Sequence, residues 1–319
     1  MKIVVLDGYL VNFDHIPWRV AETFPDLVWY DETPPELVAE RMREAGAVFA
    51  NRALLGRETL EGSKNLRYIG VFGTGYNIVD LEAADRLGIT VCNIPSYSTR
   101  AVAQSAAALM LAVANRVVAF DRFLKEGRWR AACDPGVTAI PTAELWGKTA
   151  GILGYGEIGR AFGEICRALG MRVLATRRTP GAEEGVEFVD LETLRRESDV
   201  LSIHCPLTDE TRGMVNAAFL AGMKRGAILL NTARGAILDE QAVARALDSG
   251  QLSGAGLDVF AREPAGGDHP LVRHPNCVVT PHVSWAARET RARMLEAAAD
   301  NFFSFLEGSP RNVVNHPQF

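Results

Sequence analysis

The chain has 319 residues, and at about 100–200 residues per domain this length predicts two domains. Its 34 lysines and arginines are outnumbered by 39 acidic residues, which gives a formal net charge of −5 at pH 7. That balance argues against a basic nucleic-acid surface and against a polybasic membrane patch. Hydrophobic residues make up 48% of the chain, enough for a sizeable core, so we expect a globular protein with a small-molecule ligand.

The cysteines and the N-terminal residues bear on the cellular compartment. The cysteines are five in number and form no CxxC pair (Cys92, Cys133, Cys166, Cys205 and Cys277), so free thiols in a reducing compartment are expected. The N-terminal run reaches Asp7 after four apolar residues and lacks the core of a signal peptide. The longest uncharged run, 101–115, has 15 residues, whereas a membrane span needs about 20. These features predict a cytoplasmic protein without a membrane segment.

Short β-rich runs alternate with helical spacing along the first third of the chain. The runs are KIVVLDG, LVWYD, AVFAN, LRYIGVF and ITVCNI, with segments such as TPPELVAERMREAG between them. This alternation predicts a parallel sheet with crossover helices. In the alanine-rich segment that follows, small apolar residues recur at intervals of three and four, which predicts one helix from Ala101 to Lys125.

A second series of strands and helices begins after that helix. Its six strand candidates are TAGILGYG, RVLATRR, DVLSIHC, GAILLNTA, GAGLDVF and CVVTPHV, and six is the strand count of a complete dinucleotide-binding sheet. Residues 286–305 have helical spacing and precede an extended tail. We expect this last stretch to pack back on the first domain and not to extend a sheet.

A glycine-rich motif follows the first strand of the second series and opens a helix, which is the setting of a dinucleotide-binding fingerprint. Gly154 would allow the tight turn, Gly156 would let backbone N–H groups approach a pyrophosphate, and Gly159 would let helix and strand pack closely. The alternative is a glycine-rich turn of an ordinary strand–helix unit, which this setting disfavours.

The end of the next strand bears on the choice between NAD(H) and NADP(H). NAD-binding sheets place a carboxylate there, which accepts hydrogen bonds from the ribose hydroxyls. This chain has Arg177 and Arg178 instead, and guanidinium groups bind a 2′-phosphate through paired charge-assisted bonds. The sequence thus favours NADP(H); the alternative is a solvated strand end in an enzyme that takes either cofactor.

Three polar residues after strand candidates predict acid–base chemistry. Arg234 can bind a carboxylate and polarise a carbonyl oxygen, although an arginine after a strand is commonly a surface residue. His282 lies 19 residues after Glu263, and the carboxylate can orient the imidazole and hold its proton, so that His282 protonates an oxygen at neutral pH.

The remaining histidines give weaker signals. His204 has either no chemical role or a contact with the cofactor. The other four histidines lie in polar or terminal settings and are expected to have no chemical role (His15, His269, His274 and His316). No cluster of histidine, cysteine and carboxylate residues has metal-ligand spacing, so we expect no metal site.

With Arg234, Glu263 and His282 in that order behind the glycine motif, the sequence resembles the D-isomer-specific 2-hydroxyacid dehydrogenases. The resemblance covers nearly the whole chain through seven motifs in family order. They are GVFGTGYNIVD (70–80), NIPSYSTRAVAQ (93–104), ELWGKTAGILGYGEIG (144–159), HCPLT (204–208), NTARGAILDE (231–240), GLDVFAREP (256–264) and TPHVSW (280–285).

The resemblance implies an α/β fold of two doubly wound parallel-sheet domains. A smaller, flavodoxin-like substrate domain would comprise residues 1–98 and 286–319, and a Rossmann dinucleotide-binding domain would comprise residues 99–285. It also implies a homodimer with much of its interface in the Ala101–Lys125 region. The charge balance and the short uncharged runs predict neither a nucleic-acid nor a membrane partner.

Site residues follow from the matching motifs. Arg234 would bind the substrate carboxylate and C2 oxygen, His282 would donate the proton, and Glu263 would support it. Amides of Thr74 and Gly75 would hold the carboxylate from the substrate domain, and Asn51 would line the same site. Cofactor contacts are expected from several segments: Val102, Gly154, Gly156, Glu157, Ile158, Gly159, Arg177, Arg178, His204, Cys205, Pro206, Thr232, Ala233, Asp258 and His282.

Within the family, GTGYNIVD and Trp285 look most like glycerate dehydrogenases, also called hydroxypyruvate or glyoxylate reductases, although segment 131–137 lacks the aromatic cluster associated with that subgroup. We therefore expect an NADP(H)-preferring reductase of glyoxylate or hydroxypyruvate, with NAD(H) possible. The alternatives are a nucleotide-sensing, corepressor-like binding protein and a phosphite dehydrogenase of the same superfamily. The Glu263–His282 couple argues against a formate dehydrogenase, which pairs its histidine with glutamine.

Overall fold

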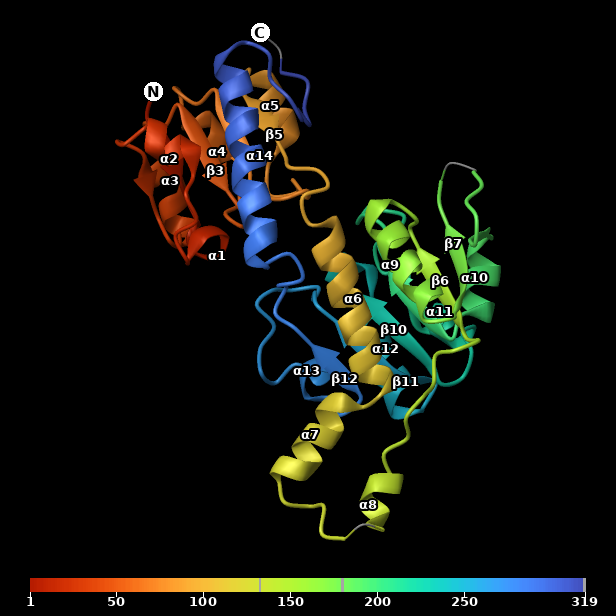
Figure 1. Ribbon diagram of the computed structural model, residues 1–319. Helices are drawn as coiled ribbons and strands as arrows, with labels where there is room; N and C mark the ends of the chain where they lie inside the picture. Colours follow the sequence, from red (N-terminus) through yellow and green to blue (C-terminus); the bar gives the residue numbers. More distant parts are fainter. Residues whose placement is uncertain (132, 179–180, 318–319) are drawn as a thin grey trace. The chain divides into compact units, whose positions relative to one another are not determined.

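The computed structural model describes residues 1–131, 133–178 and 181–317 (Figure 1). The remaining positions, which include one residue of segment 131–137 and the last two of the tail, lie outside the described residues (Ala132, Thr179, Pro180, Gln318 and Phe319). The chain divides into two compact units, each with one sheet. Unit 1 comprises Met1–Ser98 and Ala286–Phe319, and unit 2 comprises Thr99–Trp285.

Unit 1 contains a five-stranded, wholly parallel sheet in the order β2-β1-β3-β4-β5. Its strands, which match the five predicted runs, are β1 (Ile3–Val5), β2 (Val28–Trp29), β3 (Ala47–Ala50), β4 (Tyr68–Val71) and β5 (Thr90–Cys92). All residues of β1, β3, β4 and β5 are buried, which explains why these strands appear in the sequence as apolar runs. The strand order is that of flavodoxin-like sheets.

The helices of unit 1 are short except for the last one, α14 (Arg288–Leu306). The others are α1 (Tyr9–Asn12), α2 (Arg19–Thr23), the 3₁₀ helix η1 (Pro35–Leu37), α3 (Val38–Met42), α4 (Arg57–Glu61) and α5 (Leu81–Arg86). α14 packs against β4 and α2, and the ring of Phe302 contacts those of Phe49 and Tyr68. Its buried Arg291 binds the Asp14 carboxylate at 2.5 and 2.9 Å, and this pairing lowers the pKa of Asp14. The C-terminal helix is therefore part of the N-terminal unit.

The C-terminal tail makes a sheet contact that the sequence does not predict. Val313 forms an antiparallel β-bridge with Cys92 at the edge of β5, and the N–H of Val314 donates to Val91 O at 2.9 Å. The N–H of Val91 in turn donates to Asn315 Oδ1 at 2.8 Å. The tail forms no strand of the five-stranded sheet, in agreement with the expectation, and its single bridge uses backbone groups that the edge strand β5 leaves open.

Unit 2 contains a seven-stranded parallel sheet in the order β12-β11-β10-β9-β6-β7-β8. Its strands are β6 (Thr149–Leu153), β7 (Arg172–Thr176), β8 (Glu187–Phe188), β9 (Val200–Ile203), β10 (Ala227–Asn231), β11 (Leu252–Leu257) and β12 (Cys277–Val279). The six predicted strands are present, and the additional strand β8 has only two residues. The order reverses between β6 and β9, and doubly wound sheets bind ligands beyond the strand ends at such a point.

The longest helix of unit 2, α6 (Thr99–Ala114), packs against β10, β11 and α9 (Glu157–Ala168). The close approach depends on Gly256 in β11, where a Cβ atom would lie 2.8 Å from Leu109 Cβ. The other helices are α7 (Val117–Lys125), α8 (Pro135–Thr138), α10 (Leu191–Glu197), α11 (Ala217–Ala221), the 3₁₀ helix η2 (Gly235–Ile237), α12 (Glu240–Asp248) and α13 (Pro270–Arg273).

The prediction of one helix over 101–125 is wrong, because α6 and α7 are separate helices bent by 59°. Between them Arg116 adopts a left-handed φ of +53°. Its guanidinium donates to Ser253 O at 2.7 Å and to Asn276 Oδ1 at 3.0 Å. These partners lie far along the sequence, so helical spacing alone does not reveal the break. Beyond it, α7 and α8 form an arm that extends away from the sheet of unit 2 (Figure 1).

Within the described ranges, no single helix is long and apolar enough to cross a membrane. α6 and α7 reach that length and composition only together, as the bent pair. In this structure the sheet-facing side of α6 is buried in the core of unit 2.

Candidate active site

The three glycines of the turn between β6 and α9 lie in different steric environments. Gly154 has a left-handed φ of +95°, and a Cβ atom there would lie 2.5 Å from the backbone N of Cys205. A Cβ atom at Gly159 would lie 2.5 Å from Gly154 O, so helix and strand approach closely at this point. At Gly156, in contrast, a Cβ atom would meet no neighbouring described atom within 4 Å. The turn is therefore open at the glycine where a pyrophosphate would approach the backbone.

α9 begins at this turn with Gly156 as its N-cap, and no side chain caps its first amides. Glu157 accepts a hydrogen bond from Thr99 Oγ1 of α6 at 3.2 Å, and Val102 lies buried one turn further along α6. Ile158 is half-buried in the first turn of α9. Such an uncapped N-terminus of a twelve-residue helix presents N–H groups and a partial positive charge to an anion.

The chain after β9 lies directly against the glycine turn. The N–H of His204 donates to Leu153 O at 2.8 Å, and Cys205 is the residue that a side chain at Gly154 would strike. Nε2 of His204 is 2.8 Å from Ser202 Oγ, and burial lowers the pKa of His204 to about 4. The imidazole is therefore neutral at pH 7. Pro206, the next residue but one, is exposed and uses its carbonyl to accept a hydrogen bond from Thr211 Oγ1 at 2.8 Å.

β7 ends beside the same turn, because the N–H of Tyr155 donates to Thr176 O at 2.8 Å. Arg177 and Arg178 follow directly, and both are exposed. The Arg177 guanidinium lies over the ring of Phe188, 4.2 Å from its centroid. Neither arginine forms an ion pair with a carboxylate of the described residues. Two cationic groups thus lie at the strand end where a carboxylate would bind the ribose of NAD(H).

The turn that carries Arg234 follows β10 and is held by a buried amide. Asn231, which is fully buried, donates from Nδ2 to Arg234 O at 2.9 Å and accepts from the N–H of Ala233 at 3.0 Å. The guanidinium of Arg234 donates from Nη1 to Ala233 O at 2.7 Å. Asn231 was not among the predicted site residues, although it lies at the end of a predicted strand.

The Arg234 turn packs against the loop that carries Glu263. A Cβ atom at Gly235 would lie 1.8 Å from the carbonyl carbon of Phe260 and 2.3 Å from the N of Ala261. Only a glycine allows this approach of two backbones, so the arginine and the carboxylate of the site are held at a fixed separation by direct contact between their loops.

His282 and Glu263 are in contact. Nδ1 of His282 lies 2.7 Å from Oε2 of Glu263, and Oε1 of Glu263 accepts from the N–H of Phe260 at 3.1 Å. His282 has a left-handed φ of +55°. Its N–H donates to Asp258 O at 2.7 Å, and its carbonyl accepts from Trp285 Nε1 at 3.0 Å. The imidazole is therefore held by both its backbone and its ring.

Asp258 organises the loop on which His282 lies. Its side chain is almost fully buried and accepts from Thr280 Oγ1 at 2.5 Å and from the N–H groups of Val283 and Ser284 at 3.0 Å each. Both carboxylate oxygens are thus used inside the protein. The observed contacts of Asp258 are with the histidine loop, and a contact with cofactor remains a prediction.

Three further site predictions fall in unit 1, at the carboxyl ends of β3 and β4. Asn51 donates from Nδ2 to Phe72 O at 2.6 Å. Thr74 donates from Oγ1 to Ile94 O at 2.9 Å and lies one residue before Gly75. These bonds fix the loops after β3 and β4, and the contribution of Asn51, Thr74 and Gly75 to substrate binding stays a prediction.

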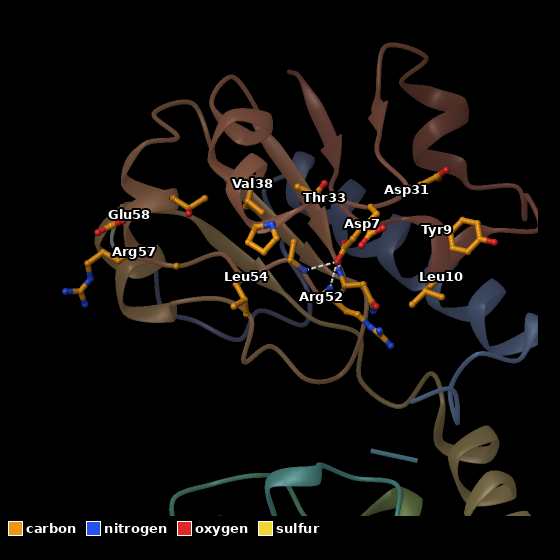
Figure 2. Close-up of a pocket in the computed structure, with 16 residues that line it drawn as sticks. Asp7, Tyr9, Leu10, Asp31, Thr33, Val38, Arg52, Leu54, Arg57 and Glu58 are labelled. Atoms are coloured by element: carbon orange, nitrogen blue, oxygen red, sulfur yellow. Dashed lines mark hydrogen bonds between the residues drawn. The ribbon is translucent and has the colours of Figure 1, made fainter. Parts of the chain in front are cut away.

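A cavity of about 1000 Å³ lies in unit 1 beyond the carboxyl ends of β1, β2 and β3 (Figure 2). Asp7 lies at its inner wall and binds the backbone of the loop after β3. Its Oδ1 accepts from the N–H of Asn51 at 2.7 Å, and its Oδ2 accepts from those of Arg52 and Ala53. Asp7 thereby fixes the loop that presents Asn51, a role that we did not predict.

The site fits a dinucleotide cofactor on structural grounds. The open Gly156 position and the uncapped end of α9 suit a pyrophosphate. In the turn after β10, Thr232 Oγ1 is buried without a hydrogen-bond partner among the described residues, so a ligand group that bonds to it would satisfy it. No group of three or more potential metal ligands occurs in the part of the chain that is described.

A Rossmann-type sheet, a glycine turn and an Arg–Glu–His set on adjoining loops define a nicotinamide-dependent oxidoreductase. Comparison with known proteins agrees. Residues 107–284 match the model of the D-isomer specific 2-hydroxyacid dehydrogenase family, NAD binding domain. The chain is 44% identical to a hydroxypyruvate reductase from Blautia hydrogenotrophica, with 99% of this chain and 100% of that protein covered. It is 43% identical to a glyoxylate reductase from Aeropyrum pernix, with 90% and 89% covered.

Among solved structures, the TT0316 protein from Thermus thermophilus is similar, with a TM-score of 0.89, 38% identity and coverage of 98% of this chain and 100% of that chain. The chain belongs to the D-isomer specific 2-hydroxyacid dehydrogenase family. It is an oxidoreductase that interconverts 2-oxo acids and 2-hydroxy acids with a nicotinamide cofactor.

Proposed function

We propose that the protein reduces glyoxylate or hydroxypyruvate with NADPH. The observation that carries the proposal is the contact between His282 Nδ1 and Glu263 Oε2 at 2.7 Å, because an imidazole oriented by a carboxylate is suited to donate a proton. The names of the relatives at 44% and 43% identity favour these two small 2-oxo acids over bulkier ones. Unit 2 acts as the cofactor domain and unit 1 as the substrate domain in this proposal.

The residues divide the chemistry among them. Bound nicotinamide supplies the hydride. Arg234 binds the substrate carboxylate and stabilises the negative charge that develops on the C2 oxygen, since a guanidinium offers several donors in one plane. His282 gives its proton to that oxygen, and Glu263 holds the imidazole in the orientation that leaves Nε2 for the transfer. Asn51, Thr74 and Gly75 contribute the carboxylate contacts from unit 1.

The preference for NADPH is supported by the end of β7. Arg177 and Arg178 are exposed there, without carboxylate partners among the described residues, and the Tyr155–Thr176 hydrogen bond places that end beside the glycine turn. A 2′-phosphate at this position would form charge-assisted hydrogen bonds with both guanidinium groups. Cofactor contacts from the other predicted residues, His204 to Pro206 and Thr232 to Ala233 among them, belong to the same proposal.

We also propose that the protein is a homodimer. Large apolar side chains are exposed on α7 and in the segments that follow it, namely Val117, Val118, Leu124, Trp129 and Trp146. Trp129 is 57% exposed and Trp146 75% exposed, values that favour a surface covered by another chain. A second copy fits because interfaces between identical chains are enriched in apolar and aromatic residues.

We place the protein in the cytoplasm in this proposal. Its five free cysteines agree with a reducing compartment.

One set of rates tests the proposal. Initial rates are measured with glyoxylate, hydroxypyruvate, pyruvate and phenylpyruvate, each with NADPH and with NADH. We expect the highest kcat/KM with glyoxylate or hydroxypyruvate and NADPH. A higher kcat/KM with NADH throughout would contradict the reading of Arg177 and Arg178, and no turnover of any 2-oxo acid would contradict the proposed activity. Light scattering of the purified protein at micromolar concentration checks the dimer.

A further inference from the structure

A second carboxylate–imidazole pair, Glu240 and His269, lies next to the loop that carries Glu263. Glu240 is the first residue of α12, and its Oε2 is 3.2 Å from Nε2 of His269. Both side chains are largely buried, with Glu240 16% exposed and His269 21% exposed. We expected a bland role for His269, because nothing in the polar segment around it pointed to a partner 29 residues upstream.

This pair is bonded to the loop that carries Glu263. Oε1 of Glu240 accepts from the N–H of Ala261 at 2.8 Å. The neighbouring Phe260 donates its N–H to Glu263 Oε1 at 3.1 Å, and its ring meets the His269 ring edge-on at 5.2 Å between centroids. The adjacent N–H groups of Phe260 and Ala261 therefore bind the carboxylates of Glu263 and Glu240, respectively.

The hydrogen bonds require a carboxylate at position 240. Nδ1 of His269 accepts from the N–H of Leu271 at 3.3 Å, so the neutral imidazole carries its proton on Nε2 and donates it to Glu240. Glu240 must then accept at both oxygens, one bond from His269 and one from Ala261. A glutamine has the same shape but only one acceptor oxygen, and its NH₂ group would face one of these two donors.

We propose that Glu240 and His269 are positioning residues, which hold the Phe260–Ala261 backbone so that Glu263 keeps its contact with His282. Neither residue touches substrate or cofactor in this assignment. The inference rests on the proposed function, in which His282 is the proton donor. It adds that the position of Glu263, and through it the orientation of His282, depends on Glu240 at the start of α12 and on His269 just before α13.

The chain supplies a matched control for the test. At the other end of α12, Asp248 Oδ1 lies 3.4 Å from Nε2 of His274, and Nδ1 of His274 accepts from the N–H of Asn276 at 3.1 Å. This pair has a similar carboxylate–imidazole contact, although the Asp248 side chain is 73% exposed, and no described contact links it to the loop of Glu263. Asp248→Asn therefore makes the same chemical change on the same helix without touching that loop.

The kinetic test compares Glu240→Gln, His269→Gln and Asp248→Asn with the wild type in glyoxylate or hydroxypyruvate reduction. We expect Glu240→Gln to lower kcat about 10- to 100-fold, because a displaced catalytic group costs that much. His269→Gln should also lower kcat. In both variants the KM for NADPH should stay within about twofold of the wild type, and Asp248→Asn should change neither constant. In a Glu263→Gln background, Glu240→Gln should have little further effect, since it acts through Glu263. Equal losses in both backgrounds, or kcat retained within twofold, would overturn the proposal.

A spectroscopic measurement separates this inference from the proposed function. The His282 Nδ1 proton that bonds to Glu263 is followed as a downfield ¹H NMR signal, identified by its loss in Glu263→Gln. We expect this signal to shift or broaden in Glu240→Gln and to stay in place in Asp248→Asn. If the wild type turns over no 2-oxo acid, the proposed function fails and the NMR comparison alone decides the inference. An unchanged signal in Glu240→Gln, with the fold intact by circular dichroism, would refute it.

Discussion

Nδ1 of His282 lies 2.7 Å from Oε2 of Glu263, and the other oxygen of that carboxylate is bound by the N–H of Phe260. The carboxylate can only accept, so Nδ1 carries a proton and the neutral ring leaves Nε2 as its basic atom. In the proposed reaction, proton transfer to and from substrate therefore occurs at Nε2. The arrangement fixes the orientation of the ring and its tautomer with one contact.

Removal of the Glu263 carboxylate should slow the chemical step. A glutamine at this position would leave the His282 ring without the charged acceptor that fixes its orientation. In Glu263→Gln we expect kcat to fall about 10- to 100-fold, while the KM for NADPH stays within about twofold. Steady-state rates of 2-oxo acid reduction measure both constants. A kcat within twofold of the wild type would mean that Glu263 does not support the proton donor.

Arg234 should dominate substrate binding and charge stabilisation. In Arg234→Ala we expect kcat/KM to fall by at least about 100-fold, as is common when a transition-state donor is lost. Arg225→Ala, at an exposed arginine of the same unit, should leave kcat/KM unchanged. Steady-state rates with the preferred 2-oxo acid provide the measurement, and normal turnover in Arg234→Ala would exclude the assigned role.

The two arginines after β7 should discriminate between the cofactors. Charge-assisted hydrogen bonds contribute about 1.5–3 kcal/mol each, so Arg178→Ala should raise the KM for NADPH about 10- to 100-fold. The KM for NADH should change little, since NADH lacks the 2′-phosphate, and it serves as the internal control. Equal effects on both cofactors would show that the arginine acts on the fold or on the pyrophosphate instead.

Gly156 and Gly159 should respond differently to alanine. A Cβ atom at Gly156 meets open space, whereas one at Gly159 lies 2.5 Å from Gly154 O. The Gly156→Ala variant should therefore keep the Tm of the wild type. Its affinity for NADPH should fall at least about tenfold, because the methyl group would occupy the space of the pyrophosphate. Gly159→Ala should lose about 1–3 kcal/mol of unfolding free energy through overpacking. Thermal unfolding and fluorescence titration with NADPH distinguish the two outcomes.

His204 should make the protein less stable in mild acid. Its pKa is about 4 in the folded protein against 6.5 in the unfolded chain, so between these values the unfolded chain binds the proton and the folded protein does not. The stability that the neutral ring provides is complete above about pH 6.5 and is lost as the pH falls towards 4. Between pH 7 and 5 this group should cost about 2 kcal/mol. Urea unfolding of the wild type and of His204→Gln at both pH values measures it; the variant should lack this part of the loss.

The sequence predicted both sheets because buried parallel strands appear as unbroken apolar runs, as in β6 and β10, where every residue is buried. It also indicated Arg234, Glu263 and His282, because ligand-contacting residues follow strand ends in this fold. The structure brings Glu263 and His282 into contact, and the catalytic roles of all three residues stay predictions. The site residues that it missed act through tertiary contacts. Asp7 binds backbone N–H groups 44 to 46 residues away, and Glu240 contacts a histidine 29 residues away.

The break between α6 and α7 was missed for a similar reason. Spacing within the segment is compatible with a continuous helix, and the left-handed residue between the two helices is an arginine, not a glycine. Its bonds to Ser253 and Asn276 lie 137 and 160 residues away. Strand β8 was missed because one of its two residues is the charged, exposed Glu187, so it lacks the apolar run that indicated the equally short β2.

The return of α14 to unit 1 has a consequence for biosynthesis. Arg291 binds Asp14, and Trp18 donates to Leu295 O at 3.0 Å, across sequence separations of 277 residues. Until α14 has been synthesised, the aromatic face formed by Phe49 and Tyr68 lacks Phe302. Unit 2 is continuous and precedes α14, so on the ribosome the second unit can complete its core while the first still waits. The first 98 residues of such a chain are the part that chaperones have to shield longest.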